Sequence, residues 1–296
     1  MGTSFTKLIS CDHETTQGEY EQYMTYYGRA VSGTETGASG SSEPYVPTNS
    51  YGYGPNYPAY YVCWYEAIMY CNLRSVAEGL TPVYYIMKDG VKLTDIAQWV
   101  DETGKLPGSN IKVSDGKFYY NSRAMTSMLD YNGDTDTDGG IQMDLAADGW
   151  RLPTDAEWEY LARGGNVSTT GQLKYSGTDS DIELTNYAWY RENSGTNGGD
   201  YSTGGKNHEV KTKLPNALNL YDMSGNAAEW CWDWSINSSD IDSSTPETGP
   251  SSGTNRICRG GDWTNFYFNC SVTGRRIINP QTRYKILGFR VVRSSN

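Results

Sequence analysis

The stretch Gly149-Trp150-Arg151-Leu152-Pro153-Thr154-Asp155-Ala156-Glu157-Trp158-Glu159-Tyr160 carries the clearest local signal in the chain. Thr154 and Glu157 have the spacing of a capping box, in which each side chain accepts a hydrogen bond from the other residue's backbone N–H. Trp158 follows on the face that we expect to point inward, and Gly164-Gly165 ends the pattern. These residues predict a helix that begins after Thr154 and packs its tryptophan into a core.

Further elements are predicted on both sides of this stretch. Residues 16–24 begin with a threonine that a glutamate follows three residues later, and residues 64–77 carry an apolar stripe behind Cys63, which occupies the cap position. The period-two alternation of residues 229–234 and the composition of residues 288–293 indicate strands. The predicted fold class is therefore α+β, with two to three helices on small antiparallel sheets and extensive ordered loops.

Composition and charge exclude several classes of protein. The 296 residues carry 24 Lys+Arg and 35 Asp+Glu, a net charge of −11, so nucleic acid is a poor candidate partner. No window approaches the ~20 apolar residues of a membrane helix, and we expect no membrane span. The 25 Tyr and 9 Trp, against 5 Phe, suit sites that are apolar on one side and wet on the other. The six cysteines show no CxxC pair, so paired and free thiols both stay open.

Three long segments rich in Gly, Ser and Pro interrupt the predicted elements, at residues 33–58, 194–206 and 237–255. Such loops are unusual inside a compact domain and usually carry a function or are insertions. None is long enough to require a second domain, so we expect a single domain over residues 5–296. We also expect a monomer, because no heptad pattern or large apolar stripe appears outside the C-terminal region.

Four motifs occur in order along the chain. They are the opening stretch, Pro215-Asn216-Ala217-Leu218-Asn219-Leu220-Tyr221-Asp222-Met223-Ser224-Gly225-Asn226-Ala227-Ala228-Glu229-Trp230, Arg259-Gly260-Gly261-Asp262-Trp263, and Gly288-Phe289-Arg290. Together they resemble the formylglycine-generating-enzyme (sulfatase-modifying factor) family, whose fold is a variant of the C-type lectin fold. The resemblance covers most of the chain and implies that fold, but a fold alone does not imply the enzyme's activity.

The chemistry of that oxidase requires two cysteines five residues apart, because Cu(I) prefers paired soft thiolates. In this sequence the second position is Cys270, but the first is Asn265, whose amide cannot replace a thiolate. Asp262 stands where the oxidase has Ser, and Ala228 stands where the family commonly has Trp. We therefore expect a protein that is not an enzyme and requires no cofactor, with Cys270 as a small buried side chain. A formylglycine-generating or related copper oxidase is the alternative.

Residues 262–286 follow neither a period of two nor a period of 3.6. A buried helix or strand would show a periodic pattern of apolar residues, so this segment is predicted to be exposed. Clustered exposed aromatic and aliphatic side chains mark binding surfaces. The positions that we expect to form a fixed frame within the segment are Trp263, Cys270, Val272, Arg275, Pro280 and Arg283.

An aperiodic segment with clustered aromatic and aliphatic residues, near the C-terminus of a C-type lectin scaffold, resembles the variable regions of diversity-generating-retroelement proteins of the treponemal kind. Such systems mutate adenines in asparagine codons, from which most residue types of the segment are reachable. The resemblance implies a lipid-anchored receptor at the cell surface or outer membrane, which displays the segment to an unknown macromolecular or glycan ligand. The predicted ligand-binding residues are Asp262, Thr264, Asn265, Phe266, Phe268, Asn269, Thr273, Gly274, Arg276, Ile277, Ile278, Asn279, Thr282, Tyr284, Lys285 and Ile286.

Two other interpretations of this segment stay open. Ile277 and Ile278 could be part of the core, which would leave only residues 262–269 displayed. Alternatively, the whole protein could be an invariant lectin-like surface protein without diversification.

Two acidic motifs bear on calcium, which prefers carboxylate and carbonyl oxygens. The residues that match a calcium site of the resembled family are Asp222, Gly225, Ala227 and Glu229. A structural calcium ion and a water-bridged turn are both open there. Residues 134–139 look like the start of an EF-hand loop, but Leu145 occupies the position of the bidentate glutamate, which favours a solvated turn. The two histidines, His13 and His208, lie near no nucleophile motif, so a His-based triad is not expected.

Overall fold

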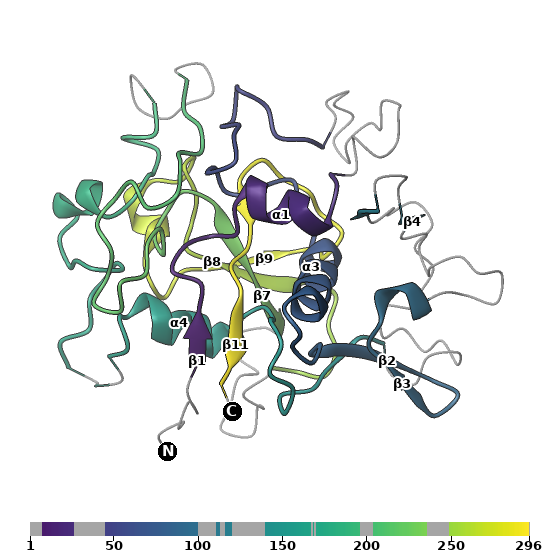
Figure 1. Cartoon of the computed structure of the whole chain (residues 1–296). Helices are drawn as coiled ribbons and strands as arrows, with labels where there is room; N and C mark the ends of the chain where they lie inside the picture. The colour runs from purple at the N-terminus through teal and green to yellow at the C-terminus, as the bar shows by residue number, and fades with distance from the viewer. Residues whose placement is uncertain are drawn as a thin grey trace.

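A four-stranded sheet forms the centre of the molecule. The computed structural model describes residues 8–26, 45–99, 111–112, 116–119, 140–166, 168, 170–195, 204–235 and 249–295. The sheet has the order β10 (Leu287–Gly288), β7 (Ala228–Trp234), β8 (Arg256–Arg259) and β9 (Arg275–Ile278). The β7–β8 and β8–β9 pairs are antiparallel, and the β10–β7 pair is parallel. The helices α3 (Trp64–Ala77) and α4 (Asp155–Ala162) lie against this sheet (Figure 1).

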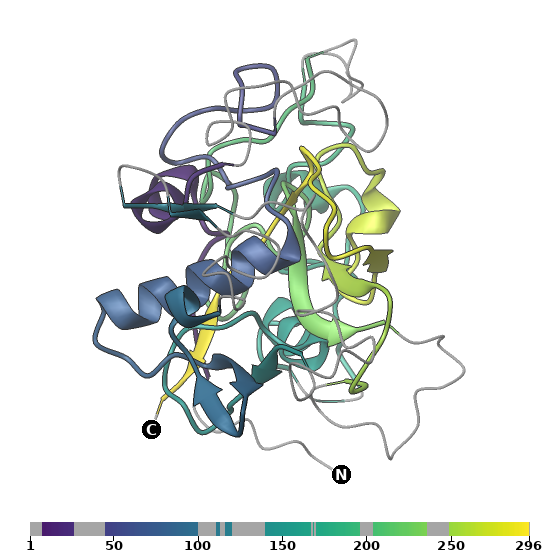
Figure 2. The same cartoon turned by 90° about the vertical axis from the view of Figure 1, so that its right-hand side faces the viewer.

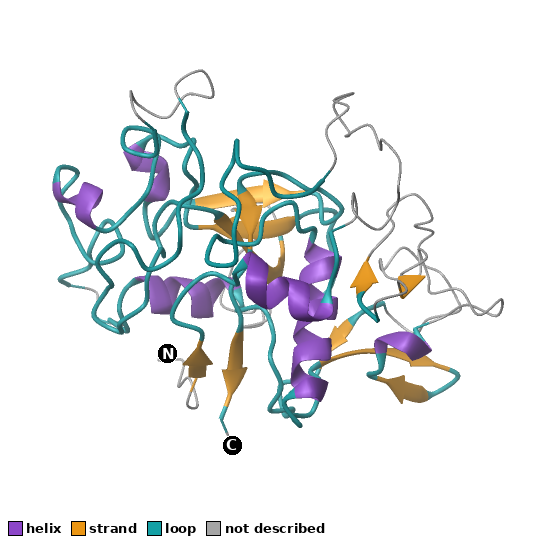
Figure 3. Cartoon of the chain, turned by 45° about the horizontal axis from the view of Figure 1, so that its top comes forward, coloured by secondary structure: helices purple, strands orange, loops and turns teal. Residues whose placement is uncertain are grey.

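Smaller elements surround this centre, and much of the described chain is loop (Figure 3). They are α1 (Gln17–Tyr23), the antiparallel pair β1 (Leu8–Ser10) and β11 (Val292–Ser294), the sheet of β3 (Val91–Leu93), β2 (Tyr84–Lys88) and β6 (Gln142–Met143), the pair β4 (Ile111–Lys112) and β5 (Phe118–Tyr119), and the 3₁₀ helices η1 (Ile96–Gln98), η2 (Glu183–Asn186) and η5 (Tyr267–Cys270). The α+β prediction is confirmed. Within the described ranges, no helix combines the length and the apolarity that crossing a bilayer would require.

The three helices begin where the sequence predicts. Thr154 caps α4, its side chain accepts from the backbone N–H of Glu157, and the Glu157 carboxylate accepts from the Thr154 N–H at 2.9 Å. Thr16 caps α1 through the same capping box. Cys63 precedes α3, and its N–H donates to the Glu66 carboxylate at 2.8 Å. The reciprocal glutamate therefore satisfies a helix end that lacks a hydroxyl cap.

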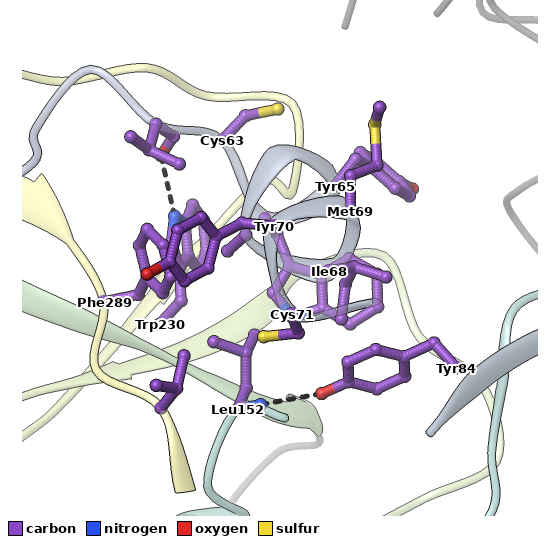
Figure 4. Close-up of a cluster of buried hydrophobic side chains, with 14 of the residues drawn as sticks. Cys63, Tyr65, Ile68, Met69, Tyr70, Cys71, Tyr84, Leu152, Trp230 and Phe289 are labelled. Carbon is purple, nitrogen blue, oxygen red and sulfur yellow. Dashed lines mark hydrogen bonds between the residues drawn. The ribbon is translucent and has the colours of Figure 1, made fainter. Parts of the chain in front are cut away.

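The largest core cluster surrounds α3 (Figure 4). Ile68, Tyr70 and Cys71 of the helix are buried there with Trp230 of β7 and Phe289. Two of the polar atoms that this core encloses are satisfied, because the indole N–H of Trp230 donates to the Val62 carbonyl at 2.9 Å and the Tyr84 hydroxyl accepts from the Leu152 N–H at 2.8 Å. All six cysteines of the chain are free.

The strand predicted at residues 229–234 is confirmed as β7, and all seven residues of β7 are buried. The other strand prediction was wrong in detail. The predicted strand 288–293 is split into β10 and β11. Between them the buried Arg290 turns towards Glu229, and the chain exchanges one pairing partner, β7, for another, β1. The EF-hand-like residues 134–139 lie outside the described part of the chain.

Candidate ligand-binding site

The candidate site is the segment of residues 262–286, which we call the display segment. It contains η5 and β9, and β9 is the last strand of the central sheet. Figure 2 shows η5 and β9 in yellow on the side of the sheet away from α3. A strand at a sheet edge leaves one side of the segment open to solvent.

Four large apolar side chains of the display segment are exposed. Phe266 is 42% exposed, Phe268 53%, Ile277 55% and Tyr284 51%. The rings of Phe266 and Phe268 stack with their centroids 5.6 Å apart, and the guanidinium of Arg191 lies 4.5 Å from the centroid of the Phe266 ring. The prediction of an exposed aromatic and aliphatic segment is thus confirmed at these positions.

Buried ion pairs connect the display segment to the rest of the fold. The Arg259 side chain of β8 donates to the carbonyls of Val272 and Gly274, at 2.9 and 3.3 Å. The same guanidinium pairs with Asp155 and Glu159 of α4. Because Arg259 has 0% exposure of its side chain, these bonds form in an environment of low dielectric, where they fix geometry strongly.

A second set of contacts holds residues near the two ends of the segment. Arg283 pairs with Glu66 of α3 at 3.0 Å, and both side chains are buried. The backbone N–H of Trp64 donates to the Pro280 carbonyl at 3.0 Å, and the backbone N–H of Trp263 donates to the Asn226 carbonyl at 2.9 Å. Trp263, Cys270, Val272, Pro280 and Arg283 are buried as frame positions should be, whereas Arg275, also predicted there, is exposed.

Two predicted ligand-binding residues do not face outward. Ile278 is 7% exposed and belongs to the main core cluster, so the interpretation that placed the isoleucine pair in the core holds for Ile278 and fails for Ile277. Asp262 is fully buried and pairs with Arg276 at 2.9 Å. Ile278 is buried because alternate residues of β9 point to opposite faces of the sheet. Asp262 is buried because its carboxylate is paired with Arg276 and does not need solvent.

The other predicted residues lie at or near the surface. The exposed ones, besides the four apolar anchors, are Asn269, Thr273 and Asn279. The half-buried ones are Thr264, Asn265, Gly274, Arg276, Thr282, Lys285 and Ile286. Most of the predicted set is therefore at least partly accessible to solvent.

A cavity of about 230 Å³ lies between the display segment and the sheet. Its predicted lining residues are Asn265, Phe268, Asn269, Gly274 and Arg276, and those that sequence reasoning missed are Ala228, Cys258, Arg259, Gly261 and Arg275. The one sequence signal that could have indicated this cavity was Ala228, a small residue at a position where the resembled family commonly has a tryptophan. Four of the missed residues, Ala228, Cys258, Arg259 and Gly261, come from β7, β8 and the turn after β8, which only the folded sheet brings beside residues 265–276, whereas Arg275 belongs to β9.

Comparison with known proteins identifies the family. Residues 6–295 match the sulfatase-modifying factor enzyme 1-like domain. The chain belongs to this family. The chaperone protein LppX of Paenibacillus barcinonensis is 32% identical over 249 residues, which are 81% of this chain and 71% of that protein. A formylglycine-generating enzyme of Streptomyces coelicolor is 34% identical over 155 residues, 48% of this chain and 46% of the enzyme.

A solved structure of the same fold covers nearly the whole chain. Treponema denticola variable protein 1 superimposes with a TM-score of 0.63 at 31% identity, over 97% of this chain and 84% of that protein. The likeness to formylglycine-generating enzymes and to treponemal variable proteins is therefore confirmed, together with the predicted fold.

The two positions that carry paired cysteines in the oxidases of this family are occupied here by Asn265 and Cys270. The Asn265 side-chain oxygen accepts from Arg276 at 3.0 Å and from the Asp262 N–H at 3.2 Å. Cys270 is fully buried, as predicted, and burial raises the pKa of its thiol. A neutral thiol and an amide already bound to an arginine do not form the thiolate pair that Cu(I) prefers.

The residues matched to a calcium site of the family do not fit the ion. Both carboxylate oxygens of Glu229 accept from Arg290 at 2.6 Å, and one also accepts from the Trp158 indole at 2.6 Å. Asp222 accepts from the Lys211 N–H, and burial raises its carboxyl pKa to about 6. The Arg290 guanidinium thus supplies the positive charge at Glu229. In the described ranges, no three acidic, histidine or cysteine side chains converge as metal ligands would.

Proposed function

We propose that this protein is a non-enzymatic ligand-binding protein whose display segment varies in sequence on a constant frame. The observation that carries the proposal is the contrast within residues 262–286. Phe266, Phe268, Ile277 and Tyr284 are about half exposed, while the arginines that hold the segment are buried. Large apolar side chains that a rigid backbone presents to water lower the entropy cost of binding a partner.

The comparison with Treponema denticola variable protein 1 supports this function, since its fold matches this chain nearly from end to end. The absence of an enzymatic function is supported by Asn265 and by the buried, neutral thiol of Cys270. We further propose a monomer that is lipid-anchored at the cell surface, with a macromolecular or glycan ligand.

The first test is genomic. A diversified protein requires a near-copy of roughly its last 40 codons, a length set by a loop and its flanking strands. The two copies should differ only at adenines of the template, and a reverse transcriptase gene should lie nearby. A genome in which the 262–286 codons have no near-copy would contradict diversification and favour an invariant lectin-like protein.

The second test concerns the oxidase alternative. The purified protein is titrated with Cu(I) and incubated with a cysteine-containing peptide, and the peptide mass is followed. We expect no stoichiometric thiolate-bound copper and no formylglycine. The matched variant is Asn265→Cys, which restores the first of the two thiol positions and should gain copper affinity. Copper binding and peptide oxidation by the wild-type protein would overturn the proposal.

A further inference from the structure

A tyrosine-rich loop, residues 45–61, lies directly beside the display segment and outside its sequence. Figures 1 and 2 place this dark-blue loop and the yellow residues after β9 at the same end of the molecule. The Tyr51 ring lies 6.3 Å from the Trp263 ring, and the Lys285 ammonium lies 4.1 Å from the centroid of Tyr51. The buried Asn207 side chain joins the two segments, because its amide donates to the carbonyls of Tyr51 and Lys285 at 2.9 and 3.0 Å.

The loop is held in one conformation by buried contacts. The Gln17 side chain, 2% exposed, donates to the carbonyls of Gly52 and Pro58 and accepts from the Gly54 N–H, each at 3.1 Å. Gly52 has a φ of +96°, and a β-carbon there would lie 2.7 Å from the Asn207 carbonyl oxygen. This position therefore requires glycine, and the loop backbone is fixed before any ligand binds.

The end of the loop is strained where it meets the display segment. Tyr61 has a φ of 60°, a left-handed conformation that costs a non-glycine residue about 1–2 kcal/mol. Its N–H donates to the Tyr284 carbonyl at 3.0 Å. Backbone strain of this kind is concentrated at functional sites, where surrounding contacts impose it.

The outward side chains of the loop have the composition of a binding surface. Tyr53 is 52% exposed, and its exposed neighbours are Asn49, Ser50, Pro55 and Asn56. Tyrosine offers a large, rigid contact area with a polar tip, and short polar side chains add adaptable hydrogen bonds. The exposed Tyr53 and Tyr284 thus belong to two segments that are bonded to each other.

The charges around this surface favour an acidic partner. Arg275 and Arg276 keep 43% and 36% of their side chains exposed, whereas the acids beneath them, Asp155 and Asp262, are 11% and 0% exposed. Arg191 and Lys285 add two more cations. The carboxylates near the arginines that keep some exposure include Glu192, which follows Arg191 in the chain, and Glu159, which is 24% exposed and lies 3.8 Å from Arg275. At Arg276, whose aspartate is fully buried, a partner therefore meets N–H donors before a carboxylate, although the whole chain carries a charge of −11.

We propose that the loop 45–61 is a constant half of the binding surface, and that the joint surface binds a protein with acidic side chains around an apolar patch. This inference rests on the proposed function of the display segment. In this arrangement the display segment changes the choice of partner, and the tyrosine loop contributes affinity to all of them.

The test uses peptides of random sequence displayed on phage, selected against the full chain. We expect the enriched pool to be rich in Asp and Glu together with aromatic residues. One enriched peptide is then synthesised, and its affinity is measured by fluorescence anisotropy. Tyr53→Ala and Tyr51→Ala should each weaken its binding at least about tenfold, as central aromatic contacts do.

The matched control is Tyr85→Ala, because Tyr85 on β2 also has a lysine, Lys92, 4.4 Å from its ring centroid but lies away from the display segment. This variant should bind the peptide like the wild-type protein. If Tyr53→Ala does the same while Phe268→Ala abolishes binding, the loop is no part of the surface and the proposed function survives. If Phe268→Ala also binds like the wild type, the proposed function itself fails.

The composition of the pool tests the class of partner separately. A pool rich in Lys and Arg, no enrichment at all, or binding of the chain to a neutral glycan array in place of acidic peptides would overturn the inference of an acidic protein partner.

Discussion

The buried region beneath the display segment and the exposed surface of the segment both contain arginines, but the arginines have different roles in the two regions. Beneath the segment, Arg259 is fully buried and its guanidinium joins α4 to the backbone of residues 272–274. On the surface, Arg276 keeps 36% of its side chain exposed above a buried aspartate. The buried region provides stability and the exposed region provides contacts, so substitutions of exposed side chains should have little effect on stability.

The largest effect is expected when the buried region is broken at Arg259. Arg259→Ala removes the fully buried partner of Asp155 and Glu159, leaving them the less buried Arg275 and Arg163, and should lower the free energy of unfolding by about 3 kcal/mol. Urea unfolding followed by tryptophan fluorescence measures this change. Arg163→Ala is the control, because its pair with Glu159 within one helix is partly exposed, and it should cost less than about 1 kcal/mol. Equal losses in the two variants would contradict the special role of Arg259.

The next effect concerns pH. Burial, and then the neighbouring Asp155, raise the pKa of Asp233 to about 7. The folded protein therefore holds a proton that the unfolded chain releases above about pH 4, and this carboxyl lowers stability as the pH rises from about 4 to 7. Asp233→Asn cannot titrate and keeps an oxygen that accepts from the Asp155 N–H, which lies 2.6 Å away in the wild type.

We expect Asp233→Asn to be more stable than the wild type at pH 8, by up to about 4 kcal/mol, since one pKa unit corresponds to about 1.4 kcal/mol. The two proteins should become equal near pH 4. Thermal and urea unfolding at pH 4, 6 and 8 give the comparison. A difference in stability that does not change with pH would show that Asp233 titrates normally.

Two neighbouring isoleucines sharpen the comparison within a single strand. Ile278 of β9 is 7% exposed and packs in the core, whereas Ile277 is 55% exposed. Ile278→Ala should lower the free energy of unfolding by about 3 kcal/mol, because it leaves a cavity. Ile277→Ala should change it by about 0.5 kcal/mol or less. The same denaturant measurement applies, and a costly Ile277→Ala would place that side chain in the core after all.

The smallest change in stability is expected at the exposed phenylalanines. Phe268→Ala removes a ring that is 53% exposed and should shift the unfolding free energy by no more than about 0.5 kcal/mol. The same variant should lose binding of a phage-selected peptide. A large loss of stability, or unchanged binding, would contradict the separation of frame and display.

Local sequence signals predicted the helices and the family well. The capping boxes at Thr16 and Thr154 depend on residues three positions apart, and so does the helix start at Cys63, and interactions over that distance are visible in the sequence. The identity of Asn265 also excluded the thiolate pair without any coordinates. The presence of exposed positions within residues 262–286 could be inferred because the segment lacks any period.

Other features of the site could not be predicted because they depend on contacts between distant residues. The burial of Asp262 depends on Arg276, and the burial of Ile278 depends on the side of β9 that faces the core. Glu229 matched a calcium motif, yet its carboxylate is occupied by Arg290, 61 residues further along the chain. The proximity of Tyr51 to Lys285 is set by the buried Asn207, which no local pattern marks.

The sequence by itself therefore determined the helix starts, the family and the absence of a thiolate pair, since these follow from residue types and short spacings. Only the tertiary structure decided which members of the display segment reach solvent, what neutralises the buried carboxylates, and which loop lies beside the segment. The physical reason is that burial and charge pairing depend on residues that are far apart in the chain and meet only when the sheet and helices pack together.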